Sequence, residues 1–384
     1  MTADAAPPTP TLYRRPLPDD TIAFGSAAGR ALFGEALAAG GLGGYFALAE
    51  QFHTQSDPAF CGLGSLVVAL NALAIDPGRL WKGPWRWFSE ELLDCCVSAE
   101  QVRAKGIDLD TLACLARCNG ADATVVRATA LDGGDAGADD DVAALRAAVI
   151  DATAGPDTVL IAAYDRGALD QNGAGHYSPI AGYHAGRDLV LVLDVARFKY
   201  PPHWVALPRL AAAMRPHDPS TARPRGFVRL RRRAGGESVG LSLACAGDSW
   251  RGLAGRLREA LTTRWPGDTP LTAIAASLAG LVDHCVLRRP AAPDHAAAID
   301  DMLTSLRATT AHRIALAATT ADGADATAAL LLLFARVHLG APEPLATHLA
   351  TLAAEADADP SLHRELEQLV AQSAALRTLT TDAR

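Results

Sequence analysis

The character of the sequence changes near residue 235, and this change limits the folds that the chain can adopt. Residues 1–230 mix glycine, proline and aromatic residues with β-branched runs. Two runs, DTVLIAAYD (157–165) and DLVLVLDVARF (188–198), are apolar and bounded by turn residues, which is typical of buried strands. We therefore expect an α+β domain, with strands and helices together, over residues 1–235.

The second part of the chain, from about residue 240 onward, is rich in alanine and leucine at helical spacing. Examples are SWRGLAGRLREALTTRW (249–265), TAIAASLAGLVDHCVL (272–287) and ADATAALLLLFARVHL (324–339). Apolar residues that recur in this way predict amphipathic helices. We therefore expect an all-α C-terminal domain over residues 236–384, joined to the first by a basic, glycine-containing segment.

Composition narrows the class of protein. The chain has 384 residues, 49% of them hydrophobic and 20% charged, which suits a globular protein with sizeable cores. A net charge of −8 argues against a nucleic-acid partner, which requires a basic face. The N-terminus lacks the apolar stretch of a secretory signal, and no apolar run is long enough to span a bilayer. The seven cysteines do not resemble a disulfide framework, so we expect a cytoplasmic protein with no membrane partner.

The acidic, glycine-rich segment LDGGDAGADDD (131–141) lacks the ligand spacing of a calcium loop. Its composition predicts a flexible surface insertion.

Cys61 stands in the stretch QSDPAFCGLGSL, where a loop gives way to the apolar segment GSLVVALNALAI. We expect a helix to begin just after Cys61, and the positive end of a helix lowers the pKa of a thiol. Gly62 and Gly64 would allow a substrate backbone to approach. Gln55 could donate its side-chain amide to an oxyanion, beside the backbone N–H of Cys61. These features favour a nucleophile, although most cysteines are small core residues.

A cysteine nucleophile needs a base, and the glycine-framed stretch NGAGHYSPIAGY offers His176. The apolar run LVLVLDVARF ends its strand at Asp194. A buried carboxylate is costly unless it is paired, and orienting His176 would pair it. The order glutamine, cysteine, histidine and aspartate is that of papain-like cysteine transferases and proteases.

Longer stretches around these residues resemble the phytochelatin synthases, the glutathione γ-glutamylcysteinyltransferases. The resemblance is carried by FHTQSDPAFCG, NALAIDPGRLWKGPWRWF and GAGHYSPIAGYHAGRDLVLVLDVARFKYPPHWV. It runs from TLYRRPLP near residue 11 to RPRGFVRL near residue 230. The resemblance implies that the N-terminal domain is papain-like and catalytic.

The same resemblance implies a ping-pong transfer. Cys61 would attack the carbonyl between the cysteine and glycine of glutathione, releasing glycine and leaving a γ-glutamylcysteinyl thioester. A second glutathione, or a growing phytochelatin oligomer, would accept the acyl group through its γ-glutamyl amine. The roles carried over are Cys61 as nucleophile, His176 as acid and base, Asp194 as its orienting residue and Gln55 at the oxyanion.

Substrate-binding residues follow from charge. The γ-glutamyl group carries a free amine and a carboxylate, so its pocket requires both a carboxylate and a guanidinium. Asp218 and Arg225, in HDPSTARPRGF, are candidates, and the resemblance places this segment by the acyl site. Arg197 and Lys199 are candidates for an anionic peptide or the second glutathione, although Arg197 could instead pair with strand ends. Gly175, directly before the expected base, is a further candidate.

The remaining cysteines raise the question of metal binding. Cys95 and Cys96 are adjacent, while Cys114 and Cys118 would share one face of a helix. Such thiolates could bind Cd²⁺ or Zn²⁺, but without a C-x-x-C pair we favour core packing. The resemblance implies activation by heavy-metal ions, and a metal–glutathione thiolate as substrate explains this without a metal site in the protein. We expect no tightly bound cofactor, and a homodimer is possible.

Two alternatives stay open at this point. A papain-like peptidase or deglycylase acting on glutathione or its conjugates would use the same triad with water as acceptor. A metal-buffering protein without catalytic activity would instead bind cadmium tightly and independently of Cys61.

Overall fold

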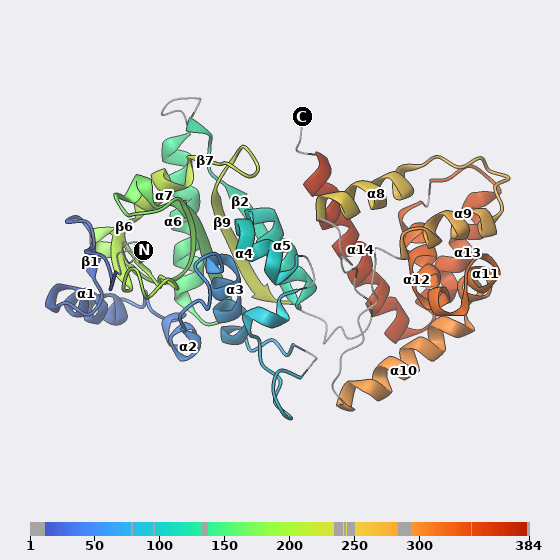
Figure 1. Cartoon of the computed structure of the whole chain (residues 1–384), viewed down its shortest axis with the longest axis horizontal. Coiled ribbons are helices and arrows are strands. Elements are labelled where there is room, and N and C mark those ends of the chain that lie inside the picture. The colour runs from blue at the N-terminus through green and yellow to red at the C-terminus, as the bar shows by residue number, and fades with distance from the viewer. Residues whose placement is uncertain are drawn as a thin grey trace, which may run out of the picture. The chain divides into compact units, whose positions relative to one another are not determined.

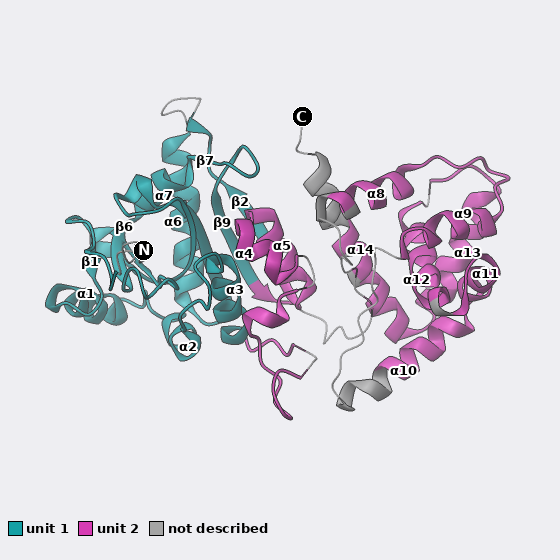
Figure 2. Ribbon diagram, viewed as in Figure 1, with its two compact units in different colours: residues 1–73, 124–230 teal, residues 74–123, 231–384 magenta. Residues whose placement is uncertain are grey.

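The computed structural model describes residues 12–77, 80–94, 97–131, 137–233, 241, 243, 250–282, 293–338 and 340–381. Two compact units are present (Figure 2): one comprises residues 1–73 and 124–230, the other residues 74–123 and 231–384. A division into domains at residue 235 stays a prediction.

A sheet of seven strands forms the framework for the residues singled out above (Figure 1). Its order is β1-β6-β5-β4-β3-β9-β2, and the pairs β1–β6, β6–β5, β5–β4 and β4–β3 are antiparallel. The strands are β1 Ile22–Ala23, β2 Ala121–Arg127, β3 Thr158–Asp165, β4 Gly175–His184, β5 Leu189–Val192, β6 His203–Ala206 and β9 Gly226–Arg232. A separate small hairpin pairs β7 (His217–Asp218) with β8 (Arg223–Pro224).

The two predicted buried strands are present. The first is β3, which is buried along almost its whole length. The second is shorter than its apolar run, because β5 ends at Val192. Asp194 then accepts a hydrogen bond from the backbone N–H of Ala196 at 2.9 Å, which turns the chain away from the strand direction.

Within its described residues, the first unit contains five α-helices. They are α1 Ala27–Ala38, α2 Tyr45–Gln51, α3 Cys61–Ala72, α6 Ala138–Ala154 and α7 Leu207–Met214. Helix α3 packs against β3 and β4, and its residues 62–70 are all buried. Side chains of α6 and α7 form an apolar cluster with β3, β4 and β5. Since α3 is fixed on the sheet, its first residue, Cys61, has a fixed place relative to β4.

The prediction for residues 131–141 is wrong in its second half. Residues 138–141 form the first turn of α6, and they include three aspartates. Asp141 also accepts hydrogen bonds from the backbone N–H of Thr129 at 3.0 and 3.1 Å. Acids are stabilising at a helix N-terminus, so this charge run starts a helix. Residues 132–136 lie outside the described residues.

The second unit is helical over its C-terminal part, as the alanine- and leucine-rich texture predicts. Its helices are α4 Ala99–Lys105, α5 Leu109–Cys118, α8 Trp250–Thr262, α9 Leu271–Ala279, α10 Pro293–Ala308, α11 Thr310–Ala318, α12 Ala321–Val337, α13 Leu345–Asp357 and α14 Pro360–Thr381, with a short 3₁₀ turn η1 at Glu90–Leu92. The centre of α12, residues 328–335, is buried throughout. Across the described helices, none has the length and apolarity needed to cross a bilayer.

Candidate active site

Cys61 is the first residue of α3. Its side chain is partly exposed, whereas the helix behind it is buried. Burial of the sulfur by the surrounding protein raises the pKa of the Cys61 thiol. Hydrogen bonds from the backbone of Tyr177 and Gly62, and the positive charge of Arg166, act in the opposite direction. The hydrogen bond from Tyr177 places the sulfur beside β4. Tyr177 directly follows His176 on this strand.

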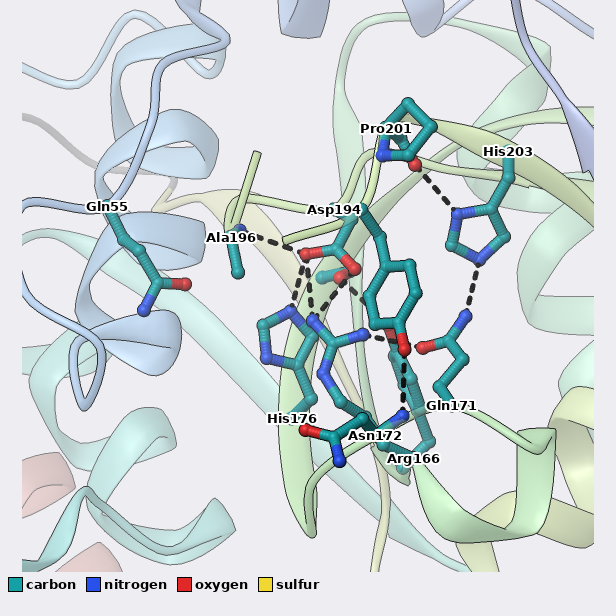
Figure 3. A network of polar contacts seen from close by, with 12 residues as sticks. Gln55, Arg166, Gln171, Asn172, His176, Asp194, Ala196, Pro201 and His203 are labelled. Carbon is teal, nitrogen blue, oxygen red and sulfur yellow. Dashed lines mark hydrogen bonds and ion pairs between the residues drawn. The ribbon is translucent and has the colours of Figure 1, made fainter. Parts of the chain in front are cut away.

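His176 is the second residue of β4, and it is buried. Its Nε2 lies 2.9 Å from Oδ1 of Asp194 (Figure 3). A carboxylate only accepts, so Nε2 carries a hydrogen and Nδ1 is the free base of the neutral ring. The ring also packs edge to face against Tyr164, its cross-strand neighbour on β3, with centroids 5.7 Å apart. Burial lowers the pKa of His176 to about 4, against the opposing charge of Asp194.

Asp194 is fully buried and receives three kinds of donor. Besides His176 and the backbone N–H of Ala196, Nη2 of Arg166 donates to Oδ1 at 3.0 Å and to Oδ2 at 2.8 Å. Burial alone would raise the pKa of Asp194. The charge and hydrogen bond of His176, together with the charge of Arg166, instead hold it well below its usual range. Asp194 is therefore an ionised carboxylate that orients His176.

Arg166 is a residue of this site that the sequence reasoning missed. It follows directly after β3 and is buried. Its Nη1 donates to Oε1 of Gln171 at 2.5 Å, and its guanidinium lies 5.1 Å from the ring centroid of Tyr200. The pairing of β3 with β4 brings the end of β3 beside His176. Predicting that β3 and β4 pair would have indicated that Arg166, directly after β3, lies near His176.

Gln55 lies close to the same residues, with 3% of its surface exposed. Its backbone N–H donates to the carbonyl of Val195, and Figure 3 shows its side chain directed toward Ala196. Nε2 donates to the carbonyls of Asp57 at 2.7 Å and Pro58 at 3.0 Å, while Oε1 has no hydrogen-bond partner within the described part of the chain. The amide hydrogens are thus used by the turn before Cys61, and the role of Gln55 at an oxyanion stays a prediction.

Arg225 and Gly175 meet beside His176. A Cβ placed on Gly175 would lie 3.2 Å from both Nε and Nη2 of Arg225, so the glycine makes room for the guanidinium. Nη1 of Arg225 donates to the carbonyls of Pro216 at 2.8 Å and His217 at 3.0 Å. Asp218 is the next residue after His217, whose carbonyl Arg225 contacts. The structure therefore brings Asp218, Arg225 and Gly175 close to one another.

Asp218 lies at the start of the turn between β7 and β8. Its Oδ1 accepts hydrogen bonds from the backbone N–H and the hydroxyl of Ser220, at 2.8 and 2.7 Å. These contacts fix the carboxylate on an exposed hairpin. Its role in substrate binding stays a prediction.

Arg197 and Lys199 follow Asp194 on one loop. Arg197 is exposed, and its guanidinium lies 5.0 Å from the ring centroid of Phe52. Lys199 is partly buried beside Gly173, where a Cβ would lie 2.9 Å from Nζ. Burial lowers the pKa of Lys199, and the charge of Arg166 lowers it further. The loop thus adds positive charge near Asp194, and the role of Arg197 and Lys199 in substrate binding stays a prediction.

Of the four cysteines considered as candidate metal ligands, the structure describes two, Cys114 and Cys118. Cys114 and Cys118 lie on α5, as expected, and Cys114 is buried. The sulfur of Cys118 accepts a hydrogen bond from Nε2 of Gln372 at 3.0 Å. Cys95 and Cys96 lie outside the described residues. Within the described ranges, no group of three or more histidine, cysteine, aspartate or glutamate side chains could hold a metal ion.

The sequence of the chain is similar to those of known proteins. Residues 12–227 match the family model described as phytochelatin synthase. The chain is 48% identical over 245 residues to glutathione gamma-glutamylcysteinyltransferase 1 of Triticum aestivum, covering 64% of this chain and 47% of that protein. For the protein of the same name from Arabidopsis thaliana, identity is 47% over 250 residues, or 65% of this chain and 50% of the relative. Glutathione gamma-glutamylcysteinyltransferase of Schizosaccharomyces pombe is 41% identical over 220 residues, which are 57% and 51% of the two chains. The chain spans about half the length of these curated relatives.

Proposed function

Because the chain belongs to the phytochelatin synthase family, we propose that it is a γ-glutamylcysteinyl transferase that makes phytochelatins from glutathione. The observation that carries the proposal is the arrangement of three side chains. Cys61 begins a buried helix against the backbone of Tyr177, and the adjacent His176 is held by Asp194 at 2.9 Å. This is the arrangement that nucleophilic catalysis by a thiol requires.

In the first half-reaction, Nδ1 of His176 takes the proton of Cys61. The thiolate attacks the carbonyl carbon of the cysteinyl–glycine bond of glutathione, and the carbonyl oxygen becomes an oxyanion. The backbone N–H of Cys61 is a donor for this oxyanion, and Gln55 becomes a second donor once it releases a turn carbonyl. His176 then returns its proton to the nitrogen of glycine, the C–N bond breaks, and a γ-glutamylcysteinyl thioester remains.

In the second half-reaction, the γ-glutamyl amine of another glutathione attacks the thioester. His176 accepts a proton from this amine and gives it to the sulfur of Cys61 as the C–S bond breaks. The product is longer by one γ-glutamylcysteine. Water in place of the amine would give γ-glutamylcysteine.

Charge suggests which residues would bind each of the two substrates. We assign the γ-glutamyl carboxylate of the first glutathione to Arg225, for which Gly175 leaves room, and its amine to Asp218. The positive loop of Arg197 and Lys199 suits the acceptor, which is an anion. Cd²⁺ or Zn²⁺ would enter as the thiolate complex of this substrate. A reducing compartment such as the cytoplasm suits a reaction in which nucleophile and substrate are both thiols.

The test is chromatography of thiols after incubation of the purified chain with glutathione, with and without Cd²⁺. Oligomers of γ-glutamylcysteine ending in glycine, formed with Cd²⁺ and absent from Cys61→Ser, support the proposal. Glycine and γ-glutamylcysteine alone would make the chain a deglycylase with the same triad. Stoichiometric cadmium binding that survives Cys61→Ala, without glycine release, would identify a metal-buffering protein instead.

A further inference from the structure

A second set of buried polar side chains continues from Arg166 and takes no part in the reaction described above. Gln171 follows the 3₁₀ turn η3 (Gly167–Leu169) with 5% of its surface exposed, and His203, the first residue of β6, is fully buried. Figure 3 shows one chain of contacts from His203 through Gln171 to Arg166. Buried polar groups are costly unless each has its partner, so the direction of every hydrogen bond in this chain can be derived.

The chain starts at the carbonyl of Pro201, which lies 2.9 Å from Nδ1 of His203. A carbonyl only accepts, so Nδ1 carries the hydrogen. Burial lowers the pKa of His203, which keeps the ring neutral. The negative charge of Asp194 opposes this effect, and the positive charge of Arg166 reinforces it. Nε2 of His203 is therefore an acceptor, and Nε2 of Gln171, 3.3 Å away, is its donor.

The orientation of Gln171 follows from this tautomer. With its amide nitrogen turned to His203, its Oε1 faces Arg166 and accepts from Nη1 at 2.5 Å. If the amide were reversed, its nitrogen would meet the guanidinium and its oxygen would meet the bare Nε2. Both contacts would be repulsive, so the tautomer of His203 selects one orientation of Gln171.

Arg166 is then held from three directions. Gln171 engages Nη1, both oxygens of Asp194 engage Nη2, and the ring of Tyr200 lies 5.1 Å from the guanidinium carbon. Oδ1 of Asp194 is also the acceptor for His176. A rotation of the guanidinium would therefore move the carboxylate that orients the base, and would change the positive charge acting on the thiol.

We propose that Gln171 and His203 are positioning residues that hold Arg166 against Asp194 and so set the electrostatic environment of Cys61 and His176. The inference rests on the proposed function, since it takes Cys61, His176 and Asp194 as the reacting residues. Neither Gln171 nor His203 is assigned to substrate or to the oxyanion.

The test compares His203→Gln with His203→Asn. The glutamine variant places an oxygen near the position of Nε2 and keeps an acceptor for Gln171. The asparagine variant keeps a donor for the carbonyl of Pro201 and loses that acceptor. The glutamine variant in turn gives up the donor to Pro201, so each variant keeps one of the two contacts of His203, and only the asparagine variant loses the contact under test.

The first readout is the rate at which iodoacetamide alkylates Cys61 as a function of pH, followed by mass spectrometry of the Cys61 peptide without glutathione. The positive charge of Arg166 favours the thiolate, so loosening Arg166 raises the pH midpoint of alkylation. We expect a rise of about half a pH unit or more in His203→Asn and no resolved change in His203→Gln. The second readout is kcat for glycine release from glutathione, which we expect to fall about fivefold to tenfold in His203→Asn with little change in KM.

Gln171→Met, which removes both amide contacts at similar length, replaces His203→Asn if that variant does not fold, with the same expectations. The inference is overturned if the asparagine or methionine variant keeps the wild-type midpoint and kcat, or if His203→Gln loses as much as His203→Asn. Failure of the proposed function has a different signature. The wild-type chain would release no glycine, while the shift in alkylation could still be measured.

Discussion

Nη2 of Arg166 donates to both carboxylate oxygens of Asp194, at 3.0 and 2.8 Å, with neither side chain open to solvent. The charge of Asp194 is therefore balanced by an arginine that stays protonated at every working pH. As a result His176 can remain neutral beside this carboxylate, which is the state that the proposed role as a base for Cys61 requires.

Arg166→Met should destabilise the protein strongly, because it leaves the buried charge of Asp194 without its cation. We expect a loss of about 3–5 kcal/mol in the free energy of unfolding, measured by urea denaturation followed by far-UV circular dichroism. A matched control is Arg146→Met, which breaks the more exposed pair with Asp188 and should cost much less. Equal losses in the two variants would contradict the buried ion pair.

Cys61→Ser should abolish glycine release while leaving the fold intact. The hydroxyl is a far weaker nucleophile than the thiol at the same position, and we expect kcat to fall by at least about a thousandfold. Cys114→Ser is the matched control, because Cys114 lies on α5 and has no proposed role in the reaction. The measurement is glycine released from glutathione, with circular dichroism to check the fold. Near-native turnover in Cys61→Ser would show that another residue is the nucleophile.

The stability of the chain should fall between pH 7 and pH 5. Burial lowers the pKa of His176 from 6.5 to about 4, so between these values the unfolded state binds more protons than the folded state. This contribution is fully present above pH 6.5 and is lost as the pH falls toward 4. At pH 5 it corresponds to roughly 1–2 kcal/mol of lost stability.

Urea denaturation at pH 7 and pH 5 measures this loss. His176→Gln cannot be protonated, so the difference between the two pH values should shrink in that variant. A difference of the same size in both proteins would mean that other groups cause the loss. His203 is also buried with a lowered pKa, and it should account for part of the remainder.

Gly175→Ala should weaken glutathione binding more than it slows the chemical step. The new methyl group would press on Nε and Nη2 of Arg225, so the guanidinium must shift from its present position. We expect KM for glutathione to rise about threefold to tenfold with a smaller change in kcat. Gly34→Ala, a substitution on α1 with open space at its Cβ position, should leave both constants unchanged. An unchanged KM in Gly175→Ala would remove Arg225 from the substrate pocket.

The sequence was sufficient to predict the elements that depend on a local pattern. The apolar runs gave β3 and the helix that begins at Cys61, and the structure confirms that His176 contacts Asp194. Arg166 could not be found in this way, because an arginine after a strand resembles any charge at a strand end. Only the antiparallel pairing of β3 with β4 brings it to Asp194.

Other differences also depend on packing that a sequence pattern does not encode. The acids at residues 139–141 could solvate a loop or start a helix, and the apolar side chains of α6 against the sheet decide for the helix. The orientation of the Gln55 amide follows from carbonyls two and three residues further on, which the motif alone does not reveal.

The bond from the backbone of Tyr177 to Cys61 also bears on how the protein matures. The two residues are far apart in the sequence, and they meet only when β4 has paired with β3 and α3 has packed on the sheet. On an emerging polypeptide Cys61 is thus an ordinary thiol with no base beside it. Since such distant contacts form late, Cys61 meets Tyr177 and the neighbouring His176 only once the sheet and α3 have come together, and under the proposed function the thiol gains its base at that point.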